Sequence, residues 1–322
     1  MEIKKTFDFY DQTYLRSYNL NESIKYQLNL LDSLDAFTRK HSENVATITC
    51  NLCRKLHLPK GFTEYCVTCA YIHDIGKMFV PQAILQKPGA LTDEEYEIIK
   101  SHTVLGYKLC IKDAKLRPFH AGPYYHHEAL NGSGYPQGLT DKEIPLEAKI
   151  IRVADEYDAL VSKRQYKSHI GIIDAFQILI DNTKPSNALQ TIINNTKPSD
   201  NSKAKGSKKV GKNSKLIVRK LKEVIVDDIE YEIACTMNYI DTLQKELKRC
   251  KKIQKEIDKM NALKKEEDIN GYKEYINMIL NKGETIENFS NVYEDIQKSF
   301  DKQHLILKDL HDEIVKVKKL KV

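Results

Sequence analysis

A chain of 322 residues is long enough to bury a sizeable core, and its length suggests one large domain or two smaller ones. Its composition, 41% hydrophobic and 30% charged, is typical of a soluble globular protein with a polar helical surface. No apolar run approaches the roughly 18 residues that span a bilayer, so we expect no membrane partner. The first residues resemble no signal peptide. We therefore expect a cytoplasmic protein with its seven cysteines reduced.

The predicted elements are helices from the start of the chain. Apolar residues at three- or four-residue spacing predict helices through Ile24, Leu28, Leu31 and Leu34, and through Val45, Ile48, Leu52 and Leu56. Thr92 and Glu95 form a capping-box pattern that predicts a helix start, whereas the glycines and prolines of 118–145 predict loop. A helix is expected at Leu146–Leu160. The sequence shows no useful alternating strand pattern, so the predicted fold class is all-α.

A basic segment then interrupts the helical pattern. Seven lysines lie in residues 197–215, against one aspartate. We interpret about 194–215 as a solvated insertion because its Ser, Asn, Gly and Lys composition cannot build a core. A contact between these lysines and an anionic nucleotide is the alternative.

Helical patterning returns at Leu216 and continues to the end of the chain. An a/d-type seam runs through Ile286, Phe289, Tyr293, Ile296, Phe300, Leu307, Leu310, Ile314 and Val317. A shorter stripe runs through Leu243, Leu247, Cys250, Ile253, Ile257 and Met260. We expect the two stripes to pack as an antiparallel helical hairpin; pairing of the seam with a second chain is the alternative.

Histidines and aspartates dominate the chemistry. Seven of the ten histidines lie between positions 41 and 127. The candidate metal ligands are His41, His73, Asp74, His102, His126, His127 and Asp155. Imidazole and carboxylate together suit divalent transition ions such as iron, manganese or nickel. An ordered set of this kind predicts a metal site.

Ligand counting favours two ions. Two octahedral ions offer about twelve coordination positions. Asp74 can bridge them if His41, His73 and Asp155 complete one ion's ligands and His102, His126 and His127 the other's. Positions then remain for a hydroxide and for phosphate oxygens, the arrangement of two-metal phosphoester hydrolysis. We expect two divalent ions, iron or manganese ahead of zinc.

A second candidate for a metal site is the pair of CxxC motifs. Cys50 and Cys53 form one and Cys66 and Cys69 the other, a spacing that is compatible with zinc. Both pairs, however, continue the apolar stripes of predicted helices, and buried cysteine packs like a small hydrophobic residue. We interpret them as core residues, with zinc as the alternative.

Four segments carry a family resemblance. YIHDIGK, SHTVLG, HHEALNGSGYPQGL and AKIIRVADEYDALVSKRQYK resemble, in order and spacing, the HD-GYP phosphodiesterases of the HD superfamily. The resemblance covers about 38–167 and extends weakly to about 235. It implies an HD-type helical bundle, the metal ligands named above, and catalytic roles for Asp74 and Lys77. It also implies substrate contacts by Lys77, Arg164 and Lys167.

Three positions depart from the family's pattern. Phe37 stands where some members carry a glutamate that supports a third ion, so we expect a binuclear site. Asn131 replaces an aspartate and keeps a hydrogen-bond acceptor while losing its charge. Gln165 replaces a proline, which frees a backbone donor.

The predicted organisation is an N-terminal helical segment at 1–37, a catalytic domain at 38–235 and a coiled-coil-like region at 236–322. The resemblance implies hydrolysis of cyclic di-GMP to pGpG, to GMP, or to both. The alternatives are hydrolysis of another cyclic or linear dinucleotide and a non-catalytic sensor or scaffold. The C-terminal helices are the candidate surface for a homodimer or a protein partner.

Overall fold

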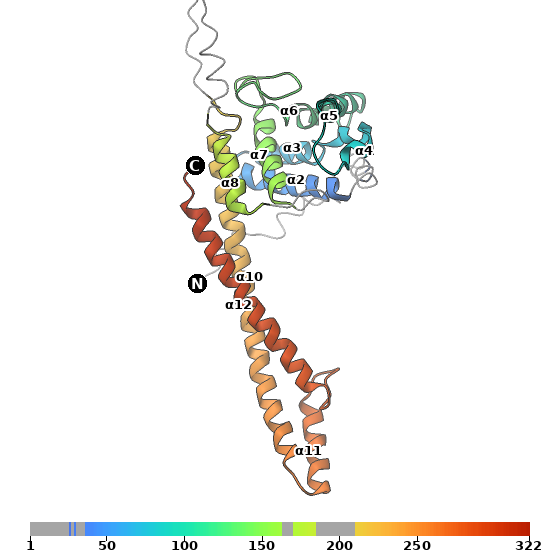
Figure 1. Cartoon of the computed structure of the whole chain (residues 1–322), viewed down its shortest axis with the longest axis vertical. Helices are drawn as coiled ribbons and strands as arrows, with labels where there is room; N and C mark the ends of the chain where they lie inside the picture. Colours follow the sequence, from blue (N-terminus) through green and yellow to red (C-terminus); the bar gives the residue numbers. More distant parts are fainter. Residues whose placement is uncertain (1–25, 27–28, 30–35, 163–169, 185–209) are drawn as a thin grey trace, which may run out of the picture. The chain divides into compact units, whose positions relative to one another are not determined.

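The structure is a computed structural model that describes Tyr26, Asn29 and residues 36–162, 170–184 and 210–322. Within these ranges the chain is helical, and its β-type pairing is one isolated antiparallel bridge between Asn131 and Thr140. The predicted all-α class is therefore confirmed. The chain divides into two compact units, one holding the described residues up to Ile225 together with Leu320–Val322 and the other Val226–Lys319 (Figure 1).

Several predictions fall outside the described residues. They concern the helical stripe at 24–34, most of the lysine-rich segment, and the substrate contacts Arg164 and Lys167 together with Gln165. None of the described helices is long and apolar enough to cross a membrane.

The first unit is a bundle of helices joined by short turns. Its longer helices are α2 (Ala36–Lys55), α3 (Lys60–Tyr71), α5 (Asp93–Lys112), α7 (Leu146–Val161), α8 (Ile172–Asp181) and the first turns of α10 (Lys215–Asn261). Its short helices are η3 (Ile75–Phe79), α4 (Gln82–Leu85), η4 (Arg117–Phe119) and α6 (Ala121–Tyr125). Helix α2 packs against α3 and α7, α5 packs against η3 and α6, and α7 packs against α8.

The connections of this bundle were predicted only in part. The capping box at the start of α5 is confirmed, because Thr92 accepts from the Glu95 amide while the Glu95 carboxylate accepts from the Thr92 amide. The expectation of loop throughout 118–145 was wrong at its beginning, where α6 forms. Pro123 is compatible with this helix because it lies in the first turn, where an amide donor has no helical partner.

The CxxC cysteines belong to the core between α2 and α3. Cys50, Cys53, Cys66 and Cys69 are all fully buried free thiols. In the described ranges, the residue groups with metal-ligand geometry contain no cysteine. Burial raises the pKa of the Cys69 thiol, which keeps it protonated rather than in the thiolate form that binds metal. These observations favour packing over a zinc site.

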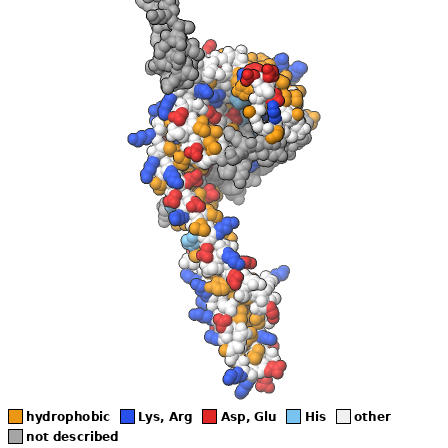
Figure 2. All heavy atoms as spheres, viewed as in Figure 1, with side chains coloured by type: hydrophobic (Ala, Val, Ile, Leu, Met, Phe, Trp, Pro, Cys, Tyr) orange, Lys and Arg blue, Asp and Glu red, His pale blue; other side chains and the backbone are white. Residues whose placement is uncertain are grey.

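The second unit consists of the rest of α10 with α11 (Glu266–Ile279) and α12 (Phe289–Lys319). One apolar cluster joins Cys250, Ile253, Ile257 and Met260 of α10 to Ile276 of α11 and Phe289 of α12. Near the other end of α12, Lys318 pairs with Glu230 of α10 at 2.7 Å. The two long helices are therefore antiparallel, as in the expected hairpin. Hydrophobic and charged side chains mix along the visible face of this unit (Figure 2).

Candidate metal centre

The first part of the centre lies between α2 and α7. His41 is in the second turn of α2, and Asp155 and Asp158 are three residues apart on α7, so both carboxylates lie on the same helix face. The Nε2 of His41 lies 3.0 Å from Oδ1 of Asp155, and its Nδ1 lies 2.6 Å from Oδ2 of Asp158. The packing of α2 on α7 brings these residues together from positions more than 110 apart in sequence.

His73 and Asp74 lie just beyond the end of α3, at the entrance to η3. Gly76 lets this segment approach α5 closely, because a Cβ built there would lie 1.9 Å from the carbonyl oxygen of His102. No larger residue fits this position without moving η3 away from α5. The glycine therefore helps to place Asp74 next to His102.

His126 and His127 follow the short helix α6. The next residue, Glu128, is buried and accepts hydrogen bonds from the amides of Gln137 at 2.6 Å and Leu139 at 2.8 Å. This carboxylate closes the loop that carries the Gly-Tyr-Pro sequence. Within the loop, the Tyr135 ring stacks on His127 with centroids 4.7 Å apart.

Asp74 is at the middle of the site, and its two carboxylate oxygens face different histidines. Oδ2 lies 3.3 Å from Nε2 of His73 and 3.8 Å from Nε2 of His41. Oδ1 lies 3.4 Å from Nε2 of His102 and 3.8 Å from Nε2 of His126. One carboxylate is thus shared between two sets of imidazoles.

The ligand-type atoms form two groups, each with atoms within 4.8 Å of one another. One group contains His41, His73 and Asp155, and the other contains Asp74, His102, His126 and His127. All seven residues expected from the sequence are therefore gathered in one place. They form the two groups that ligand counting suggested, with the oxygens of Asp74 facing histidines of both.

The histidine tautomers direct Nε2 toward Asp74. Nδ1 of His73 lies 2.7 Å from the Ala70 carbonyl oxygen, Nδ1 of His102 lies 2.6 Å from that of Ile99, and Nδ1 of His126 lies 2.9 Å from that of Gly122. A carbonyl oxygen only accepts, so each Nδ1 must carry the proton and donate it. Each Nε2 then presents a lone pair to the centre, which is the arrangement that metal-binding histidines adopt.

The buried polar atoms at the centre fit a cation. Nε2 of His73 and Oδ1 of Asp74 are buried without a hydrogen-bond partner. Nε2 of His102 and Nε2 of His126 face each other at 3.2 Å, and both carry lone pairs in the tautomers derived above. Buried acceptors left in this state cost free energy, whereas a shared divalent ion would satisfy them. The donor set therefore suits divalent metal binding.

The electrostatics keep the acidic groups charged and most of the histidines neutral. Burial opposes ionisation of Asp74, but the nearby Lys77 and His73 hold its pKa well below the usual range. Burial lowers the pKa of His102 to about 4 and that of His127 to about 3. His41 differs: burial opposes its charge, but hydrogen bonds to Asp155 and Asp158 raise its pKa to about 9. In the absence of an ion, a proton on His41 balances the carboxylates.

Lys77 and Asp158 lie next to the candidate ligands, and Asn131 lies in the loop that follows His127. Lys77 on η3 places its Nζ 2.5 Å from Oδ2 of Asp74, so the expected phosphate contact lies at the site. Asp158 was missed by sequence reasoning, although its position three residues after Asp155 on a predicted helix was a usable signal. The substituted position Asn131 keeps its acceptor role, since Oδ1 accepts from the Ser133 amide at 3.1 Å.

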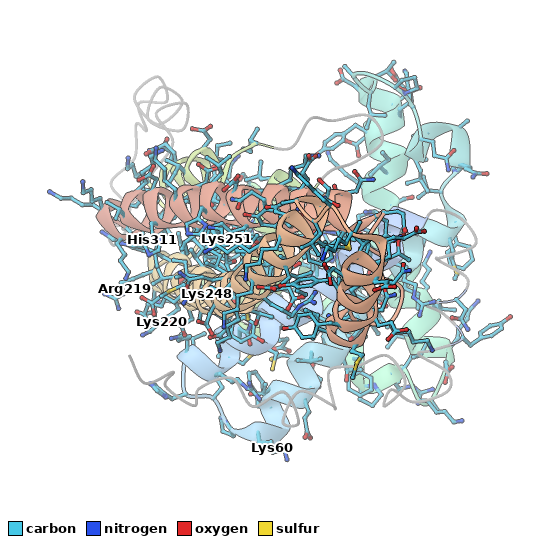
Figure 3. All side chains as sticks on the ribbon, turned by 90° about the horizontal axis from the view of Figure 1, so that it is seen from below. Lys60, Arg219, Lys220, Lys248, Lys251 and His311 are labelled. Carbon is cyan, nitrogen blue, oxygen red and sulfur yellow. The ribbon has the colours of Figure 1, made fainter. Side chains whose placement is uncertain are left out.

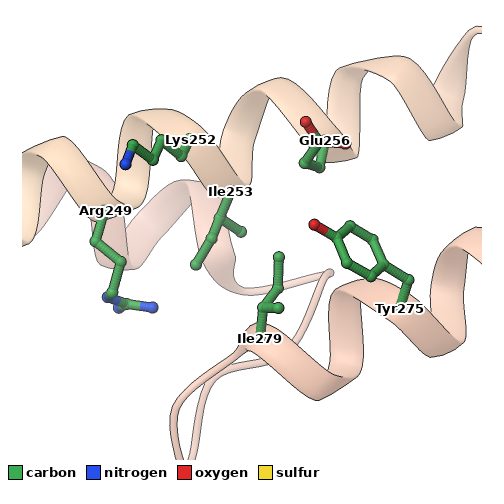
Figure 4. Close-up of a pocket in the computed structure, with 6 residues that line it drawn as sticks. All are labelled: Arg249, Lys252, Ile253, Glu256, Tyr275 and Ile279. Carbon is green, nitrogen blue, oxygen red and sulfur yellow. The ribbon is translucent and has the colours of Figure 1, made fainter.

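The second unit contains a separate hollow. Arg249, Lys252, Ile253, Glu256, Tyr275 and Ile279 line it, from α10 and α11 (Figure 4). Its only carboxylate is that of Glu256, which pairs with Lys259 and Tyr272, and it has no histidine or cysteine. Exposed basic residues such as Lys248, Lys251 and His311 lie elsewhere on α10 and α12 (Figure 3). The hollow thus lacks the ligand chemistry of the histidine groups.

Known proteins share the histidine-bearing region. A family model described as HD domain matches residues 25–186. A protein named cyclic di-GMP phosphodiesterase from Thermotoga maritima is 38% identical over 153 residues, 47% of this chain and 42% of that protein. A protein named 3'3'-cGAMP-specific phosphodiesterase 3 from Vibrio cholerae is 34% identical over 153 residues, 48% of this chain and 33% of that protein.

A solved structure titled as Bd1817, a HDG"Y"P protein from Bdellovibrio bacteriovorus, covers 66% of each chain at 18% identity, with a TM-score of 0.44. The chain spans less than half the length of the two curated relatives. The region that the family model matches contains both histidine groups and Asp74. The chain therefore belongs to the HD domain family.

Proposed function

We propose that this chain is a two-metal phosphodiesterase that hydrolyses a cyclic dinucleotide. One observation carries the proposal: the two oxygens of Asp74 face two separate groups of imidazoles. In this proposal, His41, His73, Asp74 and Asp155 hold one ion, and Asp74, His102, His126 and His127 hold the other. Mixed nitrogen and oxygen ligands of this number suit iron or manganese better than zinc.

The ions, when bound, supply a nucleophile derived from water and stabilise charge on the phosphoryl oxygens. The chain's own residues organise this chemistry. Asp74 fixes the spacing of the two groups, and the backbone carbonyls of Ala70, Ile99 and Gly122 hold the histidine tautomers. Lys77 places a positive charge beside Asp74, where a phosphate of the substrate would be bound.

Cyclic di-GMP is the proposed substrate, with pGpG, GMP or both as products. The name of the Thermotoga maritima relative supports this choice, whereas that of the Vibrio cholerae relative supports 3'3'-cGAMP as a second candidate. Both substrates present the same phosphodiester linkage, so the metal groups alone do not choose between them. We also propose that Arg164 and Lys167 contribute substrate contacts, as the family resemblance implies.

The test is a product analysis. The metal-loaded full chain is incubated with cyclic di-GMP, 3'3'-cGAMP and pGpG, and the nucleotides are separated by chromatography. We expect loss of at least one cyclic dinucleotide, and no loss with Asp74→Asn. Tight binding of a cyclic dinucleotide without turnover, in protein that holds two ions, would instead establish the sensor alternative.

A further inference from the structure

His41 differs from the other oriented histidines of the centre in the group that accepts its Nδ1 proton. His73, His102 and His126 donate to backbone carbonyl oxygens. His41 has its Nδ1 2.6 Å from the carboxylate oxygen Oδ2 of Asp158. A carboxylate acceptor draws the proton more strongly than a carbonyl does and raises the basicity of the opposite nitrogen.

Asp158 is itself held in a fixed orientation. Its Oδ1 accepts from Nδ2 of Asn44 at 2.9 Å and from Oγ of Ser162 at 2.8 Å, which leaves Oδ2 for His41. The side chain is buried, with 3% of the residue exposed. The carboxylate is therefore fixed and in contact with one candidate ligand.

We infer that Asp158 is a positioning residue for the ion at His41, His73 and Asp155. It fixes the His41 tautomer with Nε2 toward Asp155 and strengthens that nitrogen as a ligand. The ion at His102, His126 and His127 has no such support from Asp158, since two of those histidines donate to carbonyl oxygens of α5 and α6. The two ions therefore depend on Asp158 unequally. This inference rests on the proposed two-metal site.

The primary test is metal binding rather than activity. Metal-free full-length protein is titrated with Mn²⁺, and free ion is followed by electron paramagnetic resonance. Wild type should bind two ions. Asp158→Asn preserves the shape of the side chain but removes its charge. It should lower the affinity for one Mn²⁺ ion by about 10- to 100-fold and leave the affinity for the other unchanged.

A double-mutant cycle identifies the affected ion. His41→Ala should weaken binding of the same ion as Asp158→Asn does. Adding Asp158→Asn to His41→Ala should then change the affinity for that ion little further. In a His102→Ala background, by contrast, Asp158→Asn should keep its full effect. Equal weakening of both ions, or a full extra loss in the His41→Ala background, would show a general structural role and overturn the inference.

Two further variants keep the test informative if Asp158→Asn folds poorly. Ser162→Ala removes one donor to Asp158 and should weaken the same ion to a smaller extent. Thr49 lies on the same helix as His41, and its hydroxyl is buried without a hydrogen-bond partner. Thr49→Val should therefore leave the affinities for both ions unchanged. Failure of wild type to bind two ions would contradict the proposed function itself. Two wild-type ions with no response to Asp158→Asn or Ser162→Ala would contradict only the inference about Asp158.

Discussion

Lys77 forms an ion pair with Asp74, its Nζ lying 2.5 Å from Oδ2, the oxygen that also faces His41 and His73. The side chain of Lys77 is 19% exposed and that of Asp74 is 2% exposed, so the pair lies at the edge of the buried centre. An ion bound to Asp74 would compete with this contact. The ammonium group would then be available to a phosphate oxygen from the solvent side.

Replacing Lys77 should therefore separate metal binding from turnover. We expect Lys77→Met to retain both ions and to lower kcat on the accepted cyclic dinucleotide by about 100-fold or more, as for the loss of one positioned charge-stabilising donor. Metal content is measured by elemental analysis and kcat by product chromatography. Lys60→Met, an exposed lysine on α3, is the control and should behave as wild type (Figure 3). Unchanged kcat in Lys77→Met would exclude the assigned role.

Asp74 is expected to affect both ions at once. Because its two oxygens face the two histidine groups, Asp74→Ala should reduce the metal content from two ions to fewer than one per chain and abolish hydrolysis. Asp93→Ala, which removes an exposed carboxylate from the first turn of α5, is the control. Elemental analysis that finds one tightly held ion in an active Asp74→Ala protein would rule out a bridging carboxylate.

The stability of the metal-free protein should fall on acidification. His102 and His127 are neutral in the folded protein, with pKa values of about 4 and about 3, but become charged in the unfolded chain near pH 6.5. Between these folded-state pKa values and pH 6.5, the unfolded chain binds more protons than the folded protein. The free energy of unfolding therefore decreases as the pH falls through this range. From pH 6.5 to 5, each histidine should remove about 2 kcal/mol from the free energy of unfolding.

His41 should act in the opposite direction. The pKa of His41 is about 9 in the folded protein, above its value of 6.5 in the unfolded chain. Its contribution to the free energy of unfolding is therefore complete below pH 6.5 and is lost as the pH rises through 9. Metal-free protein should therefore be most stable near pH 6.5 to 7, as measured by urea unfolding with a chelator present. His41→Gln should flatten the alkaline side of this profile and leave the acidic side unchanged. A profile that rises steadily from pH 5 to 9 would contradict these assignments.

The CxxC cysteines offer an independent test of the metal assignment. Replacing Cys50, Cys53, Cys66 and Cys69 singly with Ala should leave the metal content unchanged, because all four are buried between α2 and α3. Each change should cost about 1 kcal/mol in the free energy of unfolding through the lost packing of one buried sulfur. Elemental analysis that shows the loss of one zinc per chain would revive the alternative of a structural zinc site.

The centre was predictable because its residues carry recognisable chemistry in a fixed order. His41, the His73-Asp74 pair, His102, the His126-His127 pair and Asp155 could be named from the sequence, and the structure brings all of them together. Asp158 could not be assigned in the same way, because its role depends on how α2 packs against α7. The spacing from Asp155 puts Asp158 on the same helix face, but it does not show that His41 of α2 lies opposite that face.

Helix α11 shows a different limit of sequence reasoning. Gly271, a residue of low helix propensity, lies within this helix. Among the residues that the structure describes, no atom of another part of the chain lies within 4 Å of the position of a Cβ at Gly271, so the glycine is tolerated on an open face. Its helical propensity cost, about 1 kcal/mol relative to alanine, is offset by tertiary packing, since Ile276 is fully buried in the apolar cluster.

The buried residues of the second unit form their own cluster around Ile253, Ile276 and Phe289. Arg249 of α10 also pairs with Glu284, which adds a polar connection inside this unit. The candidate metal ligands all lie in the other unit, at or before Asp155. A chain ending near residue 240 should therefore keep two ions and measurable hydrolysis, because apart from Leu320–Val322 it loses only residues of a unit with a separate core.

The shortened chain should differ from the full chain in association. The second unit carries exposed apolar side chains such as Leu305 and Met278, which suit a homodimer or another protein partner. Sedimentation of both chains at matched concentration, with elemental analysis of each, is the measurement, and the full chain should have the larger assembled mass. If the shortened chain unfolds and loses its ions, the C-terminal helices stabilise the catalytic unit directly, and the predicted boundary near residue 235 is wrong.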